Sequence, residues 1–576
     1  MTPKSSSVLR LSSYDYVIFV GTLLFSGLIG IYYGCFGTKQ ATVKEYLLGG
    51  KNIKIIPIAV SVAISHISGT LLIGTVADVY RYGSSIWLYV GAFVVMGLLA
   101  TFVYLPVFFK LQVANIYEYL EKRFDKKIKL FALILYLLCE IFMFPIMAYT
   151  PSLSFATASG LNPSLCAFLL CVICVFYTSI GGLKTVVWTD FLQFGIITIS
   201  LITLYIIGLQ TTGGFLSTWN TAANGQRLDM FNFQLDLTAR DSFWGYVIGG
   251  GLTSTALVIV HQTGLQKFLS LSTYKDCVWS VVHTVICMTL VHTFCVFIGL
   301  VAYSKYNDCD PLTSHLMSKH DQLLPYFVTE IGGSLPGVPG LFIATICSAS
   351  LSSMSSNLNA LSGVIYKDVV CEFLKKKPSD KKATNILKLI VLVIGLLCSC
   401  LVFAMEGFGE VLSMSSVIWG ITQGPILGVF TLGVLFPKAN HQGALYGMFV
   451  GCITVAGIAI PAKYYQRKGL LSSPTKPLST SGCSFFNGTN FVSTNSTTLN
   501  QFQPNVIFRT SFHCYCIIGA TVTVIVGLVI SFLTKSSSSV HKDFLSPVVY
   551  SCLQKQSGEN QEYSNGESAV ELLQKK

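Results

Sequence analysis

Long apolar runs recur along this chain and constrain its fold more than any other feature. Thirteen stretches, most of them about twenty residues long, carry few charged side chains. A helical run of this length matches the hydrocarbon thickness of a bilayer. Because lipid offers no water to an unpaired backbone group, each run must close its own hydrogen bonds, and a helix does so. The sequence therefore predicts an all-α polytopic membrane protein with 13 transmembrane helices.

The expected spans are joined mostly by short polar loops. They cover residues 17–37, 55–79, 86–109, 128–149, 163–180, 187–209, 243–268, 278–303, 341–360, 386–405, 411–436, 443–460 and 514–533. The composition supports this layout, since 52% of the 576 residues are hydrophobic and only 11% are charged. The mean hydropathy of +0.63 excludes an ordinary soluble domain.

The ninth run, residues 341–360, is apolar overall but unusually rich in hydroxyl and amide side chains. Six serines and two asparagines fall within the twelve residues 348–359. On a helix, one face would carry Ser352, Ser355, Ser356 and Asn359. Serine can also permit close helix packing by bonding to its own backbone, and that alternative stays open. We favour a ridge of oxygen ligands for a hard monovalent cation such as sodium.

Two further runs are interrupted in the middle of the membrane. The second contains SHISGT at residues 65–70, and the seventh contains GGGLTST at residues 249–255, before His261. Interrupted helices at corresponding positions of two halves indicate an inverted-repeat transporter with its binding site at the breaks. Glycines that only allow close packing are the alternative reading.

Lysine and arginine are distributed unevenly between the loops. One set of alternate loops carries most of them, including Lys267 and Lys275, which we assign to a cytoplasmic loop; Arg81 is the main exception. The positive-inside rule then places the N-terminus outside and the tail 535–576, which reads as disordered, in the cytoplasm. The net charge of +12 is explained by these loops, so no nucleic acid partner is expected.

The loop of residues 462–513 falls outside under this topology. It holds two N-x-S/T sequons, at Asn487 and Asn495, which are expected to be glycosylated. Cys309 and Cys483 also fall in exterior loops, and the sequence does not identify the partner of either thiol. Most of the other cysteines lie in apolar runs, where they behave as small hydrophobic residues.

Catalytic motifs are missing from the sequence. It contains no HExxH, no GxSxG nucleophile elbow and no GxxxxGK[ST] phosphate loop. The thirteen-span layout also leaves no soluble catalytic domain. We therefore expect a protein that is not an enzyme and that needs no cofactor.

Several segments resemble the sodium/solute symporter family. TSIGGLKTVVWTDFLQ at residues 178–193 and FPKANHQGALYGMFVG at residues 436–451 resemble its two signatures. Further segments resemble the animal branch that carries monocarboxylates, iodide, biotin and pantothenate, and most of all its sodium-coupled monocarboxylate transporters. These segments are DVYRYG at 78–83, NDCDP at 307–311, DQLLPYFVTEI at 321–331 and LPGVPGLFIA at 335–344.

The resemblance implies a LeuT-like core. Spans two to six and seven to eleven would form inverted five-helix repeats, preceded by one helix and followed by two. The implied divisions are residues 1–53 (N-terminus, first span and first loop), 54–211 (first repeat), 212–242 (extracellular loop), 243–436 (second repeat), 437–534 (last two spans) and 535–576 (cytoplasmic tail).

The resemblance also implies a sodium site between the second and ninth spans. Its ligands would be the carbonyls of Ile64, Ile67 and Ala349 and the hydroxyls of Ser352 and Ser353, with Asp190 nearby. An unwound helix leaves carbonyls without intrahelical donors, and their partial negative charge can replace the water around sodium. A cap at the start of the sixth span is an equally good reading of Asp190.

The expected substrate cavity lies beside this site. Ser65, Ser68, Tyr149 and Gln262 match cavity positions of the family. The chain departs from the family's usual pattern at His66, where an aromatic residue is usual, and at His261, where asparagine is usual. Glu140 is an additional acidic residue within the fourth span. These groups could bind a carboxylate or move a proton, with satisfied contacts between helices as the alternative.

Together these features predict a sodium-coupled symporter of the plasma membrane. Sodium and a small organic anion, expected to be a monocarboxylate, would be imported together by alternating access. Biotin, pantothenate, iodide and choline remain alternative substrates. Membrane lipid is the remaining expected partner.

Overall fold

The chain folds almost entirely into helices. The computed structural model describes residues 11–36, 42–51, 53–113, 115–314, 316–317, 320–333, 335–374, 378–403, 411–471, 473–483, 504–534 and 540–550. Over these ranges the regular elements are helical and no strand occurs. The prediction of an all-α protein is confirmed.

The helices follow one another with short connections. The first half of the chain forms α1 (Ser13–Ile31), α2 (Val43–Leu48), α3 (Ile55–His66), α4 (Gly69–Tyr82), α5 (Tyr89–Leu99), α6 (Leu105–Leu111), α7 (Ile116–Arg123), α8 (Lys126–Ser159), α9 (Pro163–Thr211) and α10 (Phe215–Asn224). The second half forms α11 (Gly250–Val258), α12 (Gln262–Phe268), α13 (Tyr274–Lys305), α14 (Leu323–Gly332), α15 (Val338–Ile365), α16 (Cys371–Phe373), α17 (Asp380–Leu401), α18 (Val411–Leu435), α19 (His441–Arg467) and α20 (Tyr515–Leu533).

Ten helices in the described ranges are long and apolar enough to cross a bilayer, or eleven if one bent pair counts as a span. This number is lower than the thirteen runs for two reasons. Helix α9 takes in two runs in one element of 49 residues. The second and seventh runs are each divided into shorter helices.

Helix α9 bends inside its own length. Forty-nine residues would reach roughly 74 Å as a straight helix, far more than one bilayer thickness. Gly182 interrupts the helical geometry with φ 54° and ψ −160°. A side chain disfavours this positive φ, so glycine suits the turn between the fifth and sixth runs.

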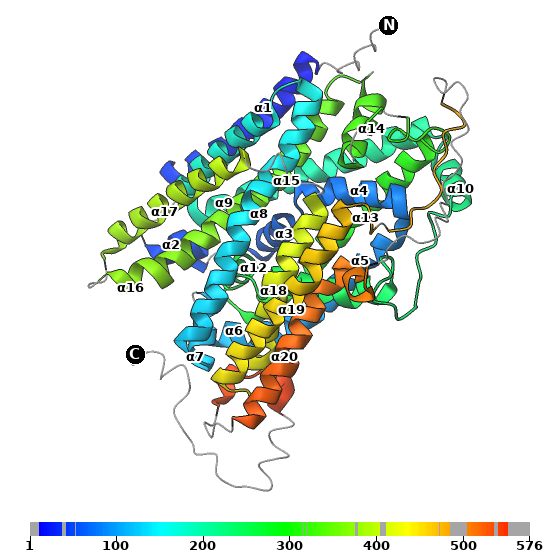
Figure 1. The fold of residues 1–576 in the computed structure, drawn as a ribbon. Coiled ribbons are helices and arrows are strands. Elements are labelled where there is room, and N and C mark those ends of the chain that lie inside the picture. The colour runs from blue at the N-terminus through cyan, green and yellow to red at the C-terminus, as the bar shows by residue number, and fades with distance from the viewer. Residues whose placement is uncertain are drawn as a thin grey trace.

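The serine-rich helix α15 lies in the interior of the protein (Figure 1). It packs against α9, α8, α1, α17 and α3. Of its most apolar part 83% is buried, the largest share among the ten candidate spans. The polar ridge predicted for residues 348–359 therefore faces other helices and is shielded from lipid.

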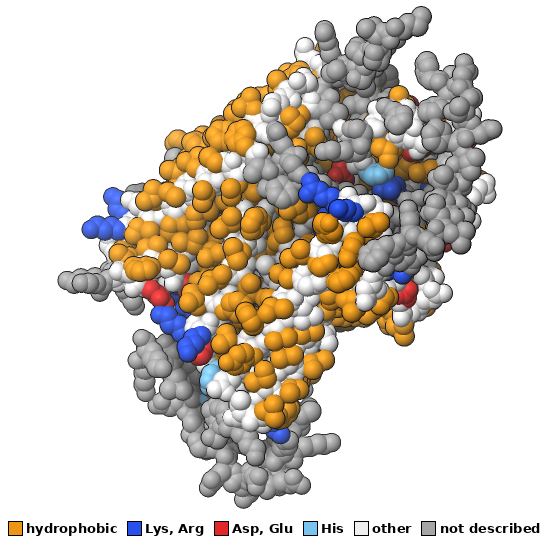
Figure 2. Space-filling model, viewed as in Figure 1, with side chains coloured by type: hydrophobic (Ala, Val, Ile, Leu, Met, Phe, Trp, Pro, Cys, Tyr) orange, Lys and Arg blue, Asp and Glu red, His pale blue; other side chains and the backbone are white. Residues whose placement is uncertain are grey.

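Apolar side chains cover much of the outer surface. Figure 2 shows a broad hydrophobic field over the visible face, with the charged side chains gathered mainly toward its margins. Val17 on α1 is 69% exposed and Ile525 on α20 is 56% exposed. Exposed apolar area of this extent fits a surface that contacts lipid.

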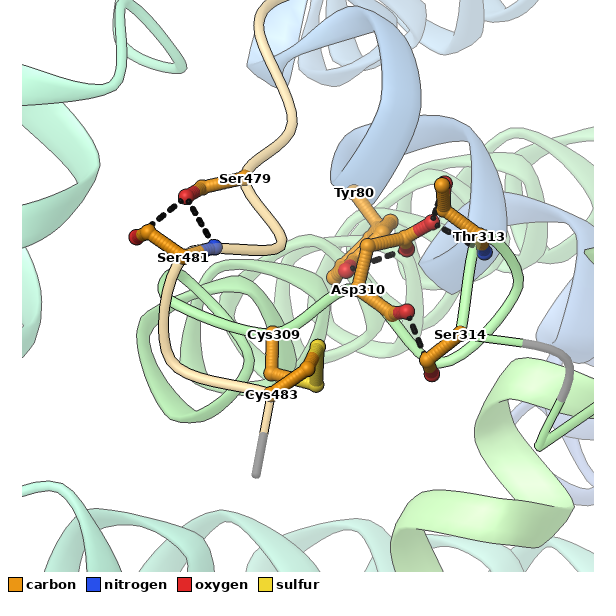
Figure 3. The surroundings of a disulfide bond; sticks show 8 residues. All are labelled: Tyr80, Cys309, Asp310, Thr313, Ser314, Ser479, Ser481 and Cys483. Carbon is orange, nitrogen blue, oxygen red and sulfur yellow. Dashed lines mark hydrogen bonds between the residues drawn. A yellow bond between two sulfur atoms is a disulfide. The ribbon is translucent and has the colours of Figure 1, made fainter. Parts of the chain in front are cut away.

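A disulfide joins two distant loops. Cys309, which follows α13, is bonded to Cys483, which follows α19 (Figure 3). The structure thus supplies the pairing that the sequence left open. Beside the disulfide, Asp310 accepts a hydrogen bond of 2.8 Å from the hydroxyl of Tyr80, which ties both loops to the end of α4.

Candidate functional site

The second run is broken where the SHISGT motif predicts. Helix α3 ends at His66, and Ile67 leaves the helical region with φ −94° and ψ 83°. Ser68 starts α4 as its N-cap, its hydroxyl accepting from the Leu71 amide at 3.3 Å. A Cβ added to Gly69 would lie 2.8 Å from the Ser350 hydroxyl, so this glycine lets the break lie directly against α15.

The break in the seventh run lies later than predicted. The segment GGGLTST was expected to interrupt the helix, yet residues 250–255 belong to α11. The chain leaves the helix between Val258 and Gln262, with His261 extended at φ −128° and ψ 141°. Gly250 and Gly251 serve packing instead, because a Cβ at Gly250 would lie 2.7 Å from the Tyr89 ring of α5.

The serine ridge of α15 meets a buried carboxylate on α9. The Ser352 hydroxyl donates to Asp190 Oδ1 at 2.6 Å, and Ser61 of α3 donates to Asp190 Oδ2 at 2.6 Å. Asp190 is fully buried and lies beyond the first turns after Gly182. These bonds exclude the alternative that Asp190 caps the sixth span, because its oxygens are committed to other helices.

A lysine completes this polar cluster. Lys267 of α12 places its Nζ 3.1 Å from Asp190 Oδ2, 2.5 Å from Ser65 Oγ and 2.7 Å from Ser356 Oγ. It also donates to the Ser61 carbonyl at 3.0 Å. The side chains of Lys267 and Asp190 are only 1% and 0% exposed. The assignment of Lys267 to a cytoplasmic loop was therefore wrong, because α12 carries it into the protein interior.

The cluster is electrically balanced. One ammonium faces one carboxylate, and a buried charge without such a partner is costly in a membrane. Four oxygens surround the ammonium, as they would surround an alkali cation. Sequence reasoning missed this role, although Lys267 lies inside the predicted seventh run 243–268, where an ionisable residue is a functional candidate.

The residues that the resemblance implies as sodium ligands lie at the end of α3, directly after it and on α15. Ile64 and Ile67 are buried on either side of the end of α3, and the Ile64 carbonyl accepts from the Ile67 amide at 3.1 Å. On α15, the Ser353 hydroxyl donates to the Ala349 carbonyl at 3.2 Å. Ser352 connects this junction to Asp190.

A cavity of about 170 Å³ lies between the two breaks. Of the expected site residues, Ser65, His66, Ser68, His261 and Ser353 line it. The described residues of its wall include no lysine or arginine, and Glu140 is their single carboxylate. Glu140 pairs with His261, whose Nε2 lies 3.1 Å from Glu140 Oε1. The carboxylate is thus partnered and is not presented alone to a solute.

Two expected cavity residues lie elsewhere. Gln262 accepts a hydrogen bond of 2.9 Å from the Ile116 amide, which fastens the second break to the start of α7. Tyr149 is buried in an apolar cluster formed largely by α8, α9 and α15. Neither residue is among the described residues that line the cavity. The sequons at Asn487 and Asn495 fall outside the described residues.

Comparisons with known proteins agree with this arrangement. Residues 46–451 match the model of the Sodium:solute symporter family. The chain is 34% identical to the sodium-coupled monocarboxylate transporter 2 of Mus musculus, over 92% of this chain and 85% of that protein. It is 31% identical to the sodium-dependent multivitamin transporter of Oryctolagus cuniculus, over 92% of this chain and 85% of that protein.

A solved structure shares the fold. The substrate-bound outward-open state of a Na+-coupled sialic acid symporter has a TM-score of 0.74 to this chain at 23% identity. The match covers 92% of this chain and 100% of that one. The family match over most of the chain and the extent of the similarity to curated transporters lead to one conclusion. This protein belongs to the sodium:solute symporter family and is a transporter, not an enzyme.

Proposed function

We propose that the chain is a sodium-coupled symporter that imports a small organic anion of the monocarboxylate class by alternating access. One observation carries this proposal: the broken helix α3–α4 lies directly against the hydroxyl-rich helix α15, deep in the protein. Backbone carbonyls freed at such a break and serine hydroxyls beside them supply the oxygen ligands that sodium requires.

The proposed sodium ligands are those that the resemblance implies. They are the carbonyls of Ile64, Ile67 and Ala349 and the hydroxyls of Ser352 and Ser353. Asp190 acts on the ion through Ser352, since the hydroxyl proton of Ser352 is directed to the carboxylate and its lone pairs are left for a cation. Sodium would thereby join the break in α3–α4 to α15.

Binding of sodium and binding of the anion are coupled because both order the break in α3–α4. Sodium that fixes the break in α3–α4 also fixes one wall of the cavity, so the anion binds better when the ion is present. One sodium ion falling through about 100 mV releases about 2.3 kcal/mol. A tenfold concentration gradient adds about 1.4 kcal/mol. A monoanion that enters with a single sodium ion cancels the electrical part, so the membrane potential contributes to accumulation of the anion only if more than one sodium ion moves with it.

The proposed substrate class is inferred from the similarity of this chain to transporters with named substrates. Similarity to a sodium-coupled monocarboxylate transporter over 92% of the chain supports a monocarboxylate. A multivitamin substrate such as biotin or pantothenate is the second candidate, because a sodium-dependent multivitamin transporter is 31% identical. Choline is disfavoured, since the carboxylate that a cation would need, Glu140, is paired with His261. Iodide remains an alternative that the same uptake experiment tests.

The decisive experiment is uptake of labelled lactate, butyrate, biotin, iodide and choline into cells that express the chain. We expect saturable uptake of a monocarboxylate that disappears when N-methylglucamine replaces sodium. Cells without the chain provide the background from passive entry of the acid. Uptake that is unaffected by this replacement would contradict sodium coupling, and uptake of biotin alone would favour the second candidate.

We further propose that the chain crosses the membrane thirteen times. Helix α9 would cross twice, the pairs α3–α4 and α11–α12 once each as broken spans, and the nine remaining candidate helices once each. The repeats would comprise residues 54–211 and 243–436, with the N-terminus outside the plasma membrane and the tail inside. The disulfide supports an outer position for the loops that follow α13 and α19, because disulfides persist in oxidising compartments.

The disulfide gives a test of this orientation. In intact cells we expect neither Cys309 nor Cys483 to react with a membrane-impermeant maleimide until a reductant is added. Replacing Cys309 with serine should expose Cys483 to the reagent from outside and destabilise the protein by about 2–5 kcal/mol. Labelling that requires permeabilised cells would place these loops in the cytoplasm.

The two sequons test the same topology independently. Asn487→Gln and Asn495→Gln should each remove one glycan, so that each variant migrates faster on a gel and the double variant resembles the enzymatically deglycosylated protein. Asn505→Gln in the same loop is the control, since no sequon begins there. If neither substitution changes migration, the segment is not exposed to the glycosylation machinery.

A further inference from the structure

A second and larger cavity lies beside the end of α4. Its volume is about 440 Å³, compared with about 170 Å³ for the central cavity. The described residues of its wall include parts of α4, of the loop before α11, of the last turns of α19 and of the segment that leads into α20. The loop after α19, which carries the disulfide, donates from the Lys476 amide to the Arg81 carbonyl at 2.9 Å. The cavity therefore lies on the side of the disulfide, which the proposed topology places outside.

Arg81 is the basic residue that the distribution of charge between the loops left unexplained. It is the penultimate residue of α4, and it lines this outer cavity. Its Nε is buried without a hydrogen-bond partner, and no ion pair joins its guanidinium to a carboxylate among the described residues. A guanidinium cannot lose its proton, and a poorly solvated charge without a partner is costly. Arg81 is therefore a permanent cation that lacks an anion.

The neighbouring arginines already have partners. Arg240 also carries a buried Nε without a hydrogen bond, but its charge is balanced by an ion pair with Asp78. Arg227 donates from two of its nitrogens to the Tyr80 carbonyl, at 3.3 Å and 3.2 Å. Arg81 differs from both, because neither a carboxylate nor a carbonyl of the described chain holds its guanidinium.

A carboxylate near Arg81 is also committed. Asp310 lines a smaller cavity together with Arg81. Its carboxylate accepts a hydrogen bond of 2.8 Å from the hydroxyl of Tyr80 and another of 2.8 Å from the amide of Thr313. Asp310 therefore fixes the loop after α13 and does not neutralise Arg81.

Basic side chains outnumber acidic ones in the described wall of the outer cavity. The basic residues are Arg81, Arg240, Lys463 and Arg509, and the acidic residues are Asp78, Asp241 and Asp321. The described wall of the central cavity, by contrast, includes no lysine or arginine. An anion on its way inward would thus meet permanent positive charge in the outer cavity and not in the central one.

The two cavities are neighbours. Phe512 belongs to the wall of both. Its ring lies 4.1 Å from the His513 ring, which lines the central cavity, and 5.4 Å from the Arg240 guanidinium, which lines the outer one. Phe512 is therefore the side chain that a solute in the outer cavity would have to pass to reach the central cavity.

We propose that Arg81 is a first binding site for the carboxylate of the solute, which it holds in the outer cavity before the solute passes Phe512. The planar fork of a guanidinium matches the two oxygens of a carboxylate. That the ligand is the transported carboxylate rests on the proposed symport. The positive charge of the site and its attraction for anions do not.

The charge of the site is tested with a cysteine reporter in intact cells. Ala239 lines the same cavity and is partly exposed, so Ala239→Cys places a thiol there. We compare its modification by an anionic and a cationic thiosulfonate reagent, with the chain that lacks this cysteine as background. Adding Arg81→Gln should lower the ratio of anionic to cationic rates by about threefold or more. Ser473→Cys, at another position of the wall, is the second reporter.

A matched control lies at the end of α19. Arg467 is exposed and is not among the described residues of the cavity wall. Arg467→Gln should leave the ratio of the two rates unchanged. If Arg81→Gln also leaves the ratio unchanged with both reporters, the anion site is overturned.

Protection by the solute tests the preference for a carboxylate. Butyrate should slow modification of the reporter by the anionic reagent more than chloride does at the same ionic strength, and Arg81→Gln should abolish this difference. Equal protection by butyrate and chloride would show only a general attraction for anions and would overturn a carboxylate site.

Butyrate uptake tests the role of the site in transport. Arg81→Gln should raise the butyrate concentration for half-maximal uptake by about tenfold at equal surface amounts. Arg81→Lys keeps the charge but loses the fork, so its value should lie between the two. An unchanged value in Arg81→Gln would overturn the role in uptake. If the unsubstituted chain shows no sodium-dependent uptake of any monocarboxylate, the proposed symport fails, and the ratio of labelling rates still decides whether Arg81 forms an anion site.

Discussion

Replacing Lys267 with methionine is expected to destabilise the protein by about 3–5 kcal/mol and to abolish transport. The substitution leaves the Asp190 carboxylate fully buried without its cationic partner. It also removes the donor that reaches Ser65, Ser356 and the Ser61 carbonyl. An unpaired charge in a membrane interior is among the most costly defects that one substitution can create. Thermal unfolding in detergent and surface expression measure the loss.

A second substitution separates charge from packing. Asp190→Asn combined with Lys267→Met removes both charges and should recover much of the lost stability, because no buried charge is left unpaired. The double variant should still transport poorly, since Ser352 and Ser61 lose the carboxylate that orients their hydroxyl groups. Equal destabilisation in the single and double variants would show that the ion pair is not the source of the effect.

Replacing Ser353 with alanine is expected to raise the sodium concentration for half-maximal uptake by about tenfold or more. The change removes one hydroxyl ligand of the proposed ion while leaving the carbonyls of Ile64, Ile67 and Ala349 in place. A hydrogen bond or ligand contact to a charged group is worth about 1.5–3 kcal/mol, and each 1.4 kcal/mol corresponds to a factor of ten. The measurement is substrate uptake against sodium concentration at constant ionic strength.

The control for this experiment lies on the same helix. Ser362 is buried in α15, and its hydroxyl donates to the Asn359 carbonyl at 2.7 Å, away from the break in α3–α4. Ser362→Ala should leave the sodium dependence unchanged. A Ser353→Ala variant that transports with the same sodium dependence as Ser362→Ala would remove Ser353 from the ion site.

The two breaks show how far local patterns carry a structural prediction. SHISGT breaks the second run because Ser68 can cap a new helix and Gly69 can approach α15 closely, and both properties belong to the residues themselves. GGGLTST does not break the seventh run, because Gly250 and Gly251 pack against the ring of Tyr89 and the side chain of Val95 on α5. Glycine permits either outcome, and only the neighbouring helix determines which one occurs.

The sequence by itself determined the all-helical membrane fold, the family and the density of oxygen atoms in α15. Hydropathy, helical periodicity and family signatures depend on consecutive residues, so they can be recognised without knowledge of distant contacts. The transported anion was also an expectation from sequence, and it stays a proposal.

The tertiary structure alone decided which polar groups meet. Lys267 reaches Asp190 across 77 positions of sequence, and Cys309 reaches Cys483 across 174. His66 spans 191 positions to the Leu257 carbonyl. Each contact depends on where broken helices and long loops approach one another in space, because an isolated segment carries no signal for its partner. Because of the same packing, Lys267, which the sequence analysis assigned to a cytoplasmic loop, is the buried partner of the Asp190 carboxylate.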